Sequence, residues 1–395
     1  MKIACVYKAV YPPVSGGSGA DRRVRDMMRG LVHAGHDVTM FVPRRDTTQT
    51  VLDIDNMQVR YIGDNAHGPS TMKTRKSYWD ELKSAVLGEG FESLILYSVQ
   101  IDGYLPARYL RKKGVKIAAE FCDLRSSGFE TKSLRQRFRK FILRLDEALI
   151  PRVTDLNIAI SQYLEKHCKD RAPNTPVIRL PILVDSGLFK TSKAAAKKIS
   201  ADWNIPDDAV VFSYVGGLWK TEGVGTLVRA FSEVVKTHPK SRLIIAGRLG
   251  KTDDHDDIEA IVETLGLQGK VITPGWVSTD DVVGIYSRSD GLALPQLNDQ
   301  FAVAALPTKL AEYSNMKKAI IATRVGDIPQ YFTSGKDILL VESENIDEIE
   351  QAMITLITDK GLRQKLGEGA SRVAQENFDY RRAGERLSAA LLAAK

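Results

Sequence analysis

The stretch "VFSYVGGLWKTEGVGTLVRAF", residues 211–231, contains an apolar run, a glycine-rich loop and a helical pattern, in that order. Glycines in such a loop let the backbone approach a ligand closely, and the helix that follows presents the positive end of its dipole. The segment "SGGSGAD", residues 15–21, follows the first apolar run of the chain in the same way. The pattern predicts two α/β domains, each of which begins with a strand, a glycine loop and a helix.

Short apolar runs alternate with helical patterns in both halves of the chain, which favours parallel sheets with helices on both faces. A segment that contains three prolines, residues 171–190, separates the halves. We therefore expect domains at residues 1–183 and 184–377, and an amphipathic helix at residues 378–395. The runs expected to form strands are "KIACVY", "VTMFV", "SLILYS", "KIAAEF" and "LNIAI", then "AVVFSYVGGLW", "SRLIIAGRLG", "KVITPGW", "DGLALP" and "KAIIATRV".

The composition favours a cytoplasmic protein of two domains. Its 395 residues are too many for one comfortable core, and no apolar run approaches the ~18–20 residues of a membrane span. The N-terminus does not resemble a signal peptide. Cys5, Cys122 and Cys168 are scattered and odd in number, which fits a reducing cytosol and indicates neither disulfides nor a zinc site. The net charge of +7 suggests an anionic partner, such as a nucleotide, a phospholipid surface or nucleic acid.

One predicted helix, residues 133–150, combines a basic face with apolar residues at helical spacing. The simpler interpretation is a surface helix whose basic face is solvated. The alternative is a helix that rests on the anionic lipid of an inner membrane face. Its basic residues are Arg135, Arg137, Arg139, Lys140 and Arg144, and its apolar residues are Leu134, Phe138, Phe141, Ile142, Leu145 and Leu149.

Several other motifs argue against particular sites. In the first glycine loop, the third glycine of a G-x-G-x-x-G fingerprint would fall on Arg22, which disfavours a dinucleotide-dependent dehydrogenase. The acidic clusters "DID" (53–55) and "DDHDD" (253–257) are interpreted as solvated loops, so no metal site is expected. No Ser-His-Asp or Cys-His arrangement can be argued, because the histidines lie in no recognisable motif.

The stretch "ALPTKLAEY", residues 305–313, reads as the start of a helix that has no capping side chain. Pro307 suits the opening turn, because its missing N–H would be unpaired there in any case. An uncapped helix start is a ready anion site, and Glu312 lies a little further along the helix. The residues by themselves leave open what the bare N–H groups face and why a single carboxylate lies nearby.

Taken together, the segments resemble the retaining nucleotide-sugar glycosyltransferases of family 4, over almost the whole chain. The resemblance implies two Rossmann-like domains that face each other across a cleft (GT-B), with the C-terminal helix crossing back to the first domain. It also implies metal-independent transfer of a sugar, with retention, from a UDP- or GDP-sugar co-substrate to a glycan, a lipid-linked or a small-molecule acceptor, without a cofactor or nucleic acid. The matching blocks include residues 16–43, 152–166, 177–189, 211–231, 242–250, 271–295 and 307–341.

The resemblance also assigns roles to particular residues. The start of the helix would face the donor diphosphate, Glu312 would bond the ribose hydroxyls, and Asp123 would orient the acceptor unless it only caps local turns. Cations near the diphosphate would come from Lys220, Lys309 or Arg248. The remaining donor-site positions are Gly16, Gly17, Ser18 and Gly19, Gly216 and Gly217, Trp276 and Val277 beside the base, and Leu306, Pro307 and Thr308.

Three positions depart from the family pattern. Ala304 stands where the family usually has a glutamate that touches the donor sugar, and Gly217 and Glu222 stand where it usually has an arginine and a lysine. These departures leave two alternatives open: a catalytically impaired scaffold or partner subunit, and a sugar-nucleotide epimerase on the same architecture. Donor turnover with and without an acceptor distinguishes them.

Overall fold

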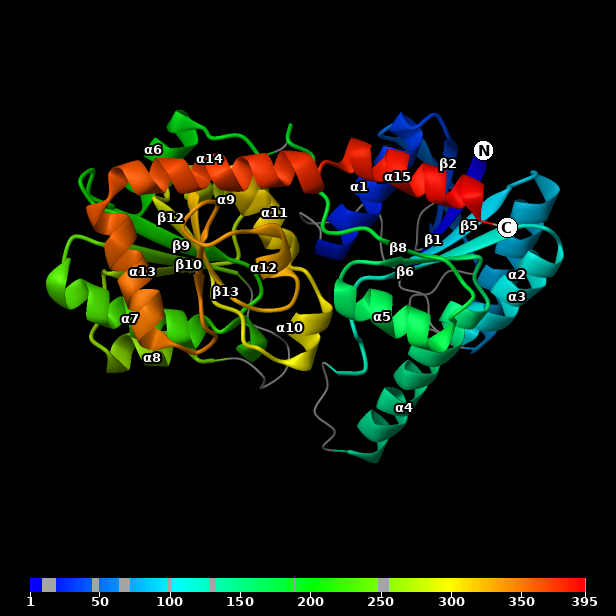
Figure 1. Ribbon diagram of the computed structural model, residues 1–395, viewed down its shortest axis with the longest axis horizontal. Coiled ribbons are helices and arrows are strands. Elements are labelled where there is room, and N and C mark those ends of the chain that lie inside the picture. The colour runs from blue at the N-terminus through cyan, green and yellow to red at the C-terminus, as the bar shows by residue number, and fades with distance from the viewer. Residues whose placement is uncertain are drawn as a thin grey trace. The chain divides into compact units, whose positions relative to one another are not determined.

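The computed structural model describes residues 1–8, 19–44, 50–63, 72–97, 101–127, 133–187, 189–247 and 256–394. The chain forms two compact units (Figure 1). Unit 1 comprises Met1–Leu183 and the C-terminal segment Tyr380–Lys395, and unit 2 comprises Val184–Asp379. Each unit is built around its own sheet. No helix among the described residues combines the length and the apolar character that a membrane span requires.

The described residues of unit 1 contain a sheet with the strand order β3-β4-β2-β1-β5-β6-β7-β8, in which only β3 runs antiparallel to its neighbour. The five predicted strands are β1, β2, β5, β6 and β7. The β3–β4 hairpin and β8 were not expected, because their residues alternate between apolar and polar and carry no continuous apolar run. The strands are β1 (Lys2–Tyr7), β2 (Asp37–Pro43), β3 (Val51–Ile54), β4 (Met57–Ile62), β5 (Ser93–Tyr97), β6 (Lys116–Phe121), β7 (Leu156–Ala159) and β8 (Val177–Arg179).

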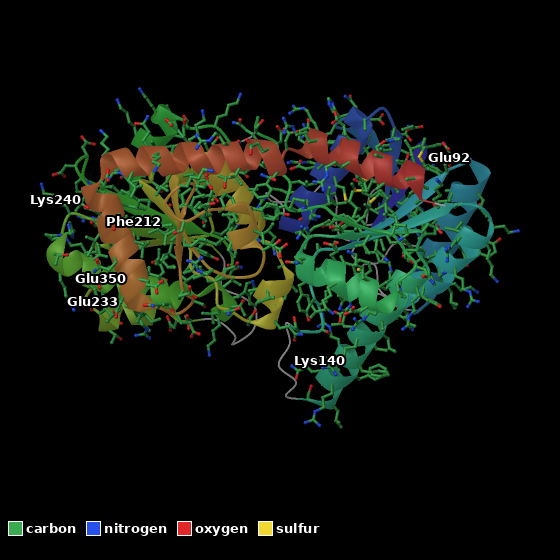
Figure 2. The ribbon with its side chains drawn as sticks, viewed as in Figure 1. Glu92, Lys140, Phe212, Glu233, Lys240 and Glu350 are labelled. Carbon is green, nitrogen blue, oxygen red and sulfur yellow. The ribbon has the colours of Figure 1, made fainter. Side chains whose placement is uncertain are left out.

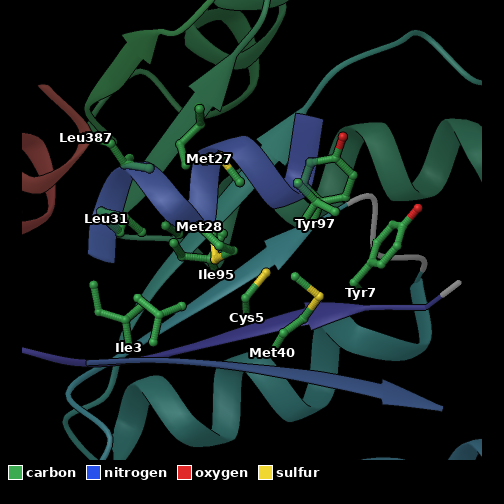
Figure 3. Close-up of a cluster of buried hydrophobic side chains, with 14 of the residues drawn as sticks. Ile3, Cys5, Tyr7, Met27, Met28, Leu31, Met40, Ile95, Tyr97 and Leu387 are labelled. Atoms are coloured by element: carbon green, nitrogen blue, oxygen red, sulfur yellow. The ribbon is translucent and has the colours of Figure 1, made fainter. Parts of the chain in front are cut away.

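Helices cover both faces of this sheet, as the alternating side chains of β1 show. Ile3 and Cys5 belong to one buried cluster and Ala4 and Val6 to another, since successive side chains of a strand point to opposite faces. Figure 3 shows the first cluster, in which Met27 approaches the strands from α1. The helices of unit 1 are α1 (Gly19–His33), α2 (Met72–Gly88), η1 (Ile101–Gly103), α3 (Tyr104–Lys112), α4 (Leu134–Leu149), η2 (Ile150–Arg152), α5 (Gln162–Arg171) and α15 (Tyr380–Ala393).

The C-terminal helix α15 packs closely against α1 within unit 1. A Cβ atom on Gly384 would lie 2.1 Å from the carbonyl carbon of Gly30, so the two backbones touch where glycines meet. Further along, the imidazole Nε2 of His36 lies 2.6 Å from the hydroxyl of Ser388. The last elements of the chain therefore complete the first unit's core.

Unit 1 also buries an ion pair beneath the carboxyl end of its sheet. Arg23 lies on α1 and Glu120 on β6. The Nε of Arg23 donates to Oε1 of Glu120 at 2.8 Å, and the Nη2 of Arg23 lies 2.7 Å from the same oxygen. Arg23 also donates to the backbone carbonyls of Leu180 and Pro181. A buried arginine needs such partners, because an unpaired buried charge is costly.

The described part of unit 2 contains a parallel sheet with the strand order β11-β10-β9-β12-β13-β14. Its five predicted strands are present, and β14 was not expected. The strands are β9 (Val211–Val215), β10 (Arg242–Ala246), β11 (Val271–Gly275), β12 (Gly291–Leu294), β13 (Ala319–Thr323) and β14 (Leu339–Val341). The helices are α6 (Lys193–Asp202), η3 (Lys220–Glu222), α7 (Val224–Thr237), α8 (Ile258–Thr264), α9 (Thr279–Arg288), α10 (Gln300–Ala304), α11 (Thr308–Asn315), α12 (Ile328–Tyr331), α13 (Ile346–Thr358) and α14 (Lys360–Asn377).

The strand orders locate one crevice in each unit. In unit 1, β2 lies on one side of β1 and the later strand β5 lies on its other side. In unit 2, β10 and β12 flank β9 in the same way. Ligands of open α/β sheets bind beyond the carboxyl ends of the strands where the order reverses. The candidate residues should therefore follow β1 and β5 in unit 1, and β9 and β12 in unit 2.

Candidate functional site

The glycine loop after β9 is shaped by close backbone contacts. Gly223, which precedes α7, has a φ of 67°, and a Cβ atom there would lie 1.9 Å from the carbonyl oxygen of Pro295. A Cβ atom on Gly247, after β10, would lie 1.7 Å from the carbonyl oxygen of Gly216. No other residue type fits either position without moving the backbone. These glycines hold the loop against the ends of β10 and β12.

Helix α11 begins beside this loop without a capping side chain. The helix starts at Thr308, and Pro307 precedes it with φ −70° and ψ 125° and makes no side-chain cap. Pro307 is thus the capping residue rather than part of the first turn, one position earlier than predicted, and its carbonyl accepts from the N–H of Leu310 at 2.9 Å. Leu306 is buried, and Thr308 is half-buried. The first N–H groups of α11 remain available to an anion.

Glu312, on the next turn of α11, is buried and not a surface glutamate. Its residue exposure is 5%, and its Oε2 accepts a hydrogen bond from the hydroxyl of Tyr286 at 3.2 Å. Tyr286 packs edge-on against Tyr313, with ring centroids 5.2 Å apart, and the Tyr313 hydroxyl accepts from the N–H of Val215 at 3.1 Å. The two tyrosines thereby link Glu312 to the carboxyl end of β9.

Lys309 is not the spare cation that the sequence suggested. Its Nζ lies 2.7 Å from Oε2 of Glu222 and donates to the hydroxyl of Tyr214 at 2.9 Å. The hydroxyl of Tyr214 in turn donates to the carbonyl of Gly217 at 2.6 Å, and burial, assisted by the charge of Glu222, raises the pKa of Tyr214 well above its usual value. Glu222, one of the departures from the family, is therefore neutralised by Lys309.

The ion pair between Lys309 and Glu222 also leaves little room for a side chain at position 216. A Cβ atom on Gly216 would lie 2.7 Å from Nζ of Lys309 and 2.9 Å from the hydroxyl of Tyr214. Lys220, on η3, is exposed. Arg248 lies outside the described residues, as do Gly16, Gly17 and Ser18. Gly19 is described and is the first residue of α1.

Two other predicted positions occupy different environments. Trp276 follows β11 and is 52% exposed, so core packing is not its role, while Val277 is half-buried. Ala304 ends α10 and is fully buried. A glutamate at position 304 would therefore place a carboxylate in a space that now holds a methyl group.

A second group of polar residues follows β6 in unit 1. A cavity of about 40 Å³ lies there between the end of β6 and helix α4. Asp123 lines it, and no described residue is recorded as donating a hydrogen bond to its carboxylate, so the turn-capping interpretation finds no support. Burial raises the pKa of Asp123, against a lowering by Arg125. The lining residues are Leu96, Ala119, Glu120, Phe121, Cys122, Asp123, Arg125, Leu143, Asp146, Glu147 and Ile150.

Asp146, on α4, is a functional candidate that the sequence interpretation missed. It is 6% exposed, and neither of its carboxylate oxygens has a hydrogen bond of good geometry to the described residues. Burial raises the pKa of Asp146 to about 6; the nearby backbone of Ile101 and Arg125 oppose the rise, and Asp102 and Glu147 add to it. The available signal was an acidic residue at an inward-facing position of an otherwise basic helix.

This pKa predicts a pH-dependent effect of Asp146→Asn. A folded-state pKa above the unfolded value means that ionisation of Asp146 lowers stability as the pH rises from about 4 to 6. Relative to the wild type, the variant should gain about 1–2 kcal/mol in the free energy of unfolding between pH 4.5 and 7.5, less than the full shift implies because water screens the site. Urea unfolding at both pH values measures it. An equal effect at both would mean that Asp146 is already ionised at pH 4.5.

The described residues contain no group of three or more histidines, cysteines, aspartates or glutamates placed to hold a metal ion. Of the two acidic clusters, Asp53 lies in β3 and Asp55 in the turn that follows, with φ 53°. Asp257 caps helix α8 by accepting from the N–H of Ala260 at 3.0 Å, and residues 253–255 lie outside the described ranges. The described acids of both clusters thus have local structural roles.

Comparison with known proteins shows that part of the chain is similar to a known family. Residues 195–373 match the model of the glycosyl transferases group 1 family. D-inositol 3-phosphate glycosyltransferase of Corynebacterium jeikeium is 28% identical over 200 residues, which are 50% of this chain and 46% of that protein. Alpha-D-kanosaminyltransferase of Streptomyces kanamyceticus is 23% identical over 225 residues, 57% of this chain and 56% of that protein. The chain therefore spans about half the length of the curated relatives it matches.

Solved structures resemble the whole chain in fold. Sucrose-phosphate synthase of Thermosynechococcus elongatus superimposes with a TM-score of 0.79 at 18% identity, and 100% of both chains is covered. Anabaena Alr3699/HepE in complex with UDP superimposes with a TM-score of 0.78 at 16% identity, also over 100% of both chains. The predicted fold class, two Rossmann-like units of the GT-B type, is confirmed.

Proposed function

Because residues 195–373 match the model of the glycosyl transferases group 1 family, we propose that this protein transfers a sugar from a nucleoside-diphosphate-sugar to an acceptor, with retention and without a metal ion. The bond between the sugar's anomeric carbon and the diphosphate breaks, and a bond to an acceptor oxygen forms. The acceptor's proton passes to the leaving diphosphate. The observation that carries the proposal is the uncapped start of α11, with the buried carboxylate of Glu312 one turn behind it.

Three parts of the donor, the diphosphate, the ribose and the base, have candidate counterparts in unit 2. The N–H groups at the start of α11 match the negative charge that develops on the leaving diphosphate. Glu312, held by Tyr286, can accept hydrogen bonds from two adjacent ribose hydroxyls. The exposed ring of Trp276 offers a stacking surface for the base. A UDP-sugar is the donor class we propose first, since HepE of the same fold was solved with UDP and with UDP-glucose.

A thermal-shift series with UDP, GDP and ADP tests the donor proposal. A ligand at ~100 times its dissociation constant stabilises the folded state by ~2.7 kcal/mol, so one diphosphate should raise the melting temperature of unit 2 clearly above the others. Incubation with the matching nucleotide sugar then separates the alternatives. Transfer requires an acceptor, an epimerase converts the donor alone, and a scaffold does neither. Absence of any nucleotide effect would overturn the proposal.

We also propose that the protein contacts anionic membranes through helix α4. Three apolar side chains on one face of its first half are exposed: Leu134 (82%), Phe138 (65%) and Phe141 (55%). Their i, i+4, i+7 spacing forms a single stripe, and none of residues 134–144 is acidic. The solvated-helix interpretation explains the basic residues but not the exposed aromatic ones. Figure 2 labels Lys140, one of the cations of this segment. Apolar insertion combined with cationic flanks is typical of helices that lie in the lipid interface.

Vesicle flotation tests the membrane contact. Changing Arg135, Arg139 and Lys140 to glutamine should lower partitioning onto phosphatidylglycerol vesicles by up to about two orders of magnitude, since each cation near an anionic surface contributes ~1 kcal/mol. Added salt should also lower the partitioning onto these vesicles. The matched control changes three exposed cations at the end of α3 to glutamine, namely Arg108 and Lys112 of the helix and Lys113, which caps it. A wild type that ignores anionic vesicles at low salt would contradict the proposal.

A further inference from the structure

The cavity between β6 and α4 contains more negative charge than its surroundings balance. Four carboxyl groups line it, together with the guanidinium of Arg125, and Lys8, which pairs with Asp102, also interacts electrostatically with Asp146. Glu120 is paired through Oε1 with Arg23 on its far side, but its Oε2 is buried and has no hydrogen-bond partner among the described residues. The carboxylate oxygens of Asp146 are buried and also lack a hydrogen bond of good geometry to the described residues, and the backbone of Ile101 only partly offsets their burial.

Such an arrangement destabilises the folded protein unless something fills it. A buried polar group without a hydrogen bond lowers the stability of the folded state, and a charged group lowers it more. In Glu147, by contrast, both carboxylate oxygens accept hydrogen bonds, Oε1 from the N–H of Ser126 at 2.8 Å and Oε2 from its hydroxyl at 2.7 Å. Glu120, Asp123 and Asp146 are therefore the groups that could bind something else. Unbalanced polar groups of this kind are found preferentially at functional sites.

The size of the cavity limits the ligand. Each water-sized group needs about 10–15 Å³ of such space, so a cavity of about 40 Å³ holds roughly three of them. That is too small for a sugar ring and suits a single head group such as –CH₂–NH₃⁺. An ammonium group has three donors and no acceptor, which complements carboxylate oxygens. The described residues are not grouped for a metal ion, and an anion would be repelled.

We propose that this cavity, lined by Glu120, Asp123 and Asp146, binds a primary ammonium group of the acceptor. The inference rests on the proposed function only in calling the ligand an acceptor. The cavity lies after β6, one strand beyond the switch in strand order between β1 and β5, and Leu96 of β5 also lines it, so it adjoins the edge where α/β sheets bind ligands. The ammonium group orients the molecule, and a different group of the acceptor, its hydroxyl, receives the sugar.

Helix α4 connects the cavity with the proposed membrane surface. Phe138 and Asp146 lie eight residues apart on this helix, which corresponds to about 12 Å along its axis. An acceptor with an ammonium group could thus be a free amino sugar, or an aminolipid that the membrane presents. Both share the chemistry that the cavity recognises.

Calorimetry with methylammonium chloride tests the proposal on the full chain. The matched probe is tetramethylammonium chloride at equal ionic strength, which has the same charge but no N–H donor and a larger head group. Methylammonium should bind at least tenfold more tightly than tetramethylammonium. At pH 6 its binding should also release protons, seen as a dependence of the heat on the buffer's ionisation enthalpy, because a cation favours the ionised carboxylates.

Variants assign the binding to the cavity. Asp146→Asn, which keeps the size of the side chain, should weaken methylammonium binding at least tenfold. Asp170→Asn, the same change at an exposed position of α5, should leave it unchanged. Equal affinity of the wild type for both probes, or equal affinity of the two variants for methylammonium, would overturn the proposal.

Two further comparisons separate the sources of the amine and the two proposals. Glucosamine is compared with N-acetylglucosamine, and dioctanoyl phosphatidylethanolamine with dioctanoyl phosphatidylcholine. The pair in which the compound with a primary amine binds more tightly shows whether the amine belongs to a sugar or to a lipid. If neither pair shows a difference in affinity, the result counts against the inference. UDP binding is measured on the same samples. If the protein binds UDP but none of the amines, only the inference about the cavity is overturned. If it binds the amines but not UDP, the inference about the cavity is supported and the donor proposal is overturned.

Discussion

Replacing Arg23 by methionine is expected to lower the free energy of unfolding by about 3–5 kcal/mol, because it leaves the buried carboxylate of Glu120 without its cation. The same guanidinium also holds the carbonyls of Leu180 and Pro181, so several contacts are lost together. Urea unfolding measures the loss. Hydrogen exchange with mass spectrometry should place it in α1 and β6 of unit 1 and leave unit 2 unchanged.

Two controls make this result specific. The double variant Arg23→Met with Glu120→Met removes both charges, and it should regain much of the lost stability because well-packed apolar residues can replace a buried pair. Arg108→Met, at an exposed position of α3, should change the free energy of unfolding by less than about 0.5 kcal/mol. If Arg23→Met costs no more than Arg108→Met, the ion pair does not hold β6 in place.

Replacing Glu312 by glutamine is expected to weaken binding of the donor diphosphate by about 1–3 kcal/mol, or roughly 5- to 150-fold, because the hydrogen bonds to the ribose lose their charge. Glutamine can still accept from the hydroxyl of Tyr286, so folding should be little changed. Glu312→Ala removes that acceptor as well. It should lose more affinity and also about 1 kcal/mol of stability. Calorimetric titration with UDP, with thermal melts of the same samples, measures both.

The 2′,3′-dideoxy form of the nucleotide decides what Glu312 contacts. If Glu312 binds the ribose hydroxyls, the wild type and Glu312→Gln should bind the dideoxy nucleotide about equally well. An equal loss for both nucleotides would show that Glu312 acts elsewhere, for example by placing Lys309 at the start of α11. Unchanged affinity for both would remove Glu312 from the donor site.

Sequence patterns were sufficient for the features that depend on neighbours along the chain. The apolar runs located ten of the described strands, and glycines followed by a helical pattern located the loop after β9. The absence of a capping residue before Thr308 was equally visible, because a cap is a contact over two or three residues. The strands that were missed, β3, β4, β8 and β14, are short or alternate with polar residues.

Only the tertiary structure decided which charges are available to a ligand. Lys309 and Glu222 lie 87 residues apart, and Arg23 and Glu120 lie 97 apart, so nothing local in the sequence predicts that they pair. The burial of Glu312 and the unbalanced carboxyl group of Asp146 likewise depend on which elements fold over them. The reason is physical: a strand or helix is selected by the spacing of its own side chains, whereas desolvation and pairing of a charge depend on atoms that folding brings from distant parts of the chain.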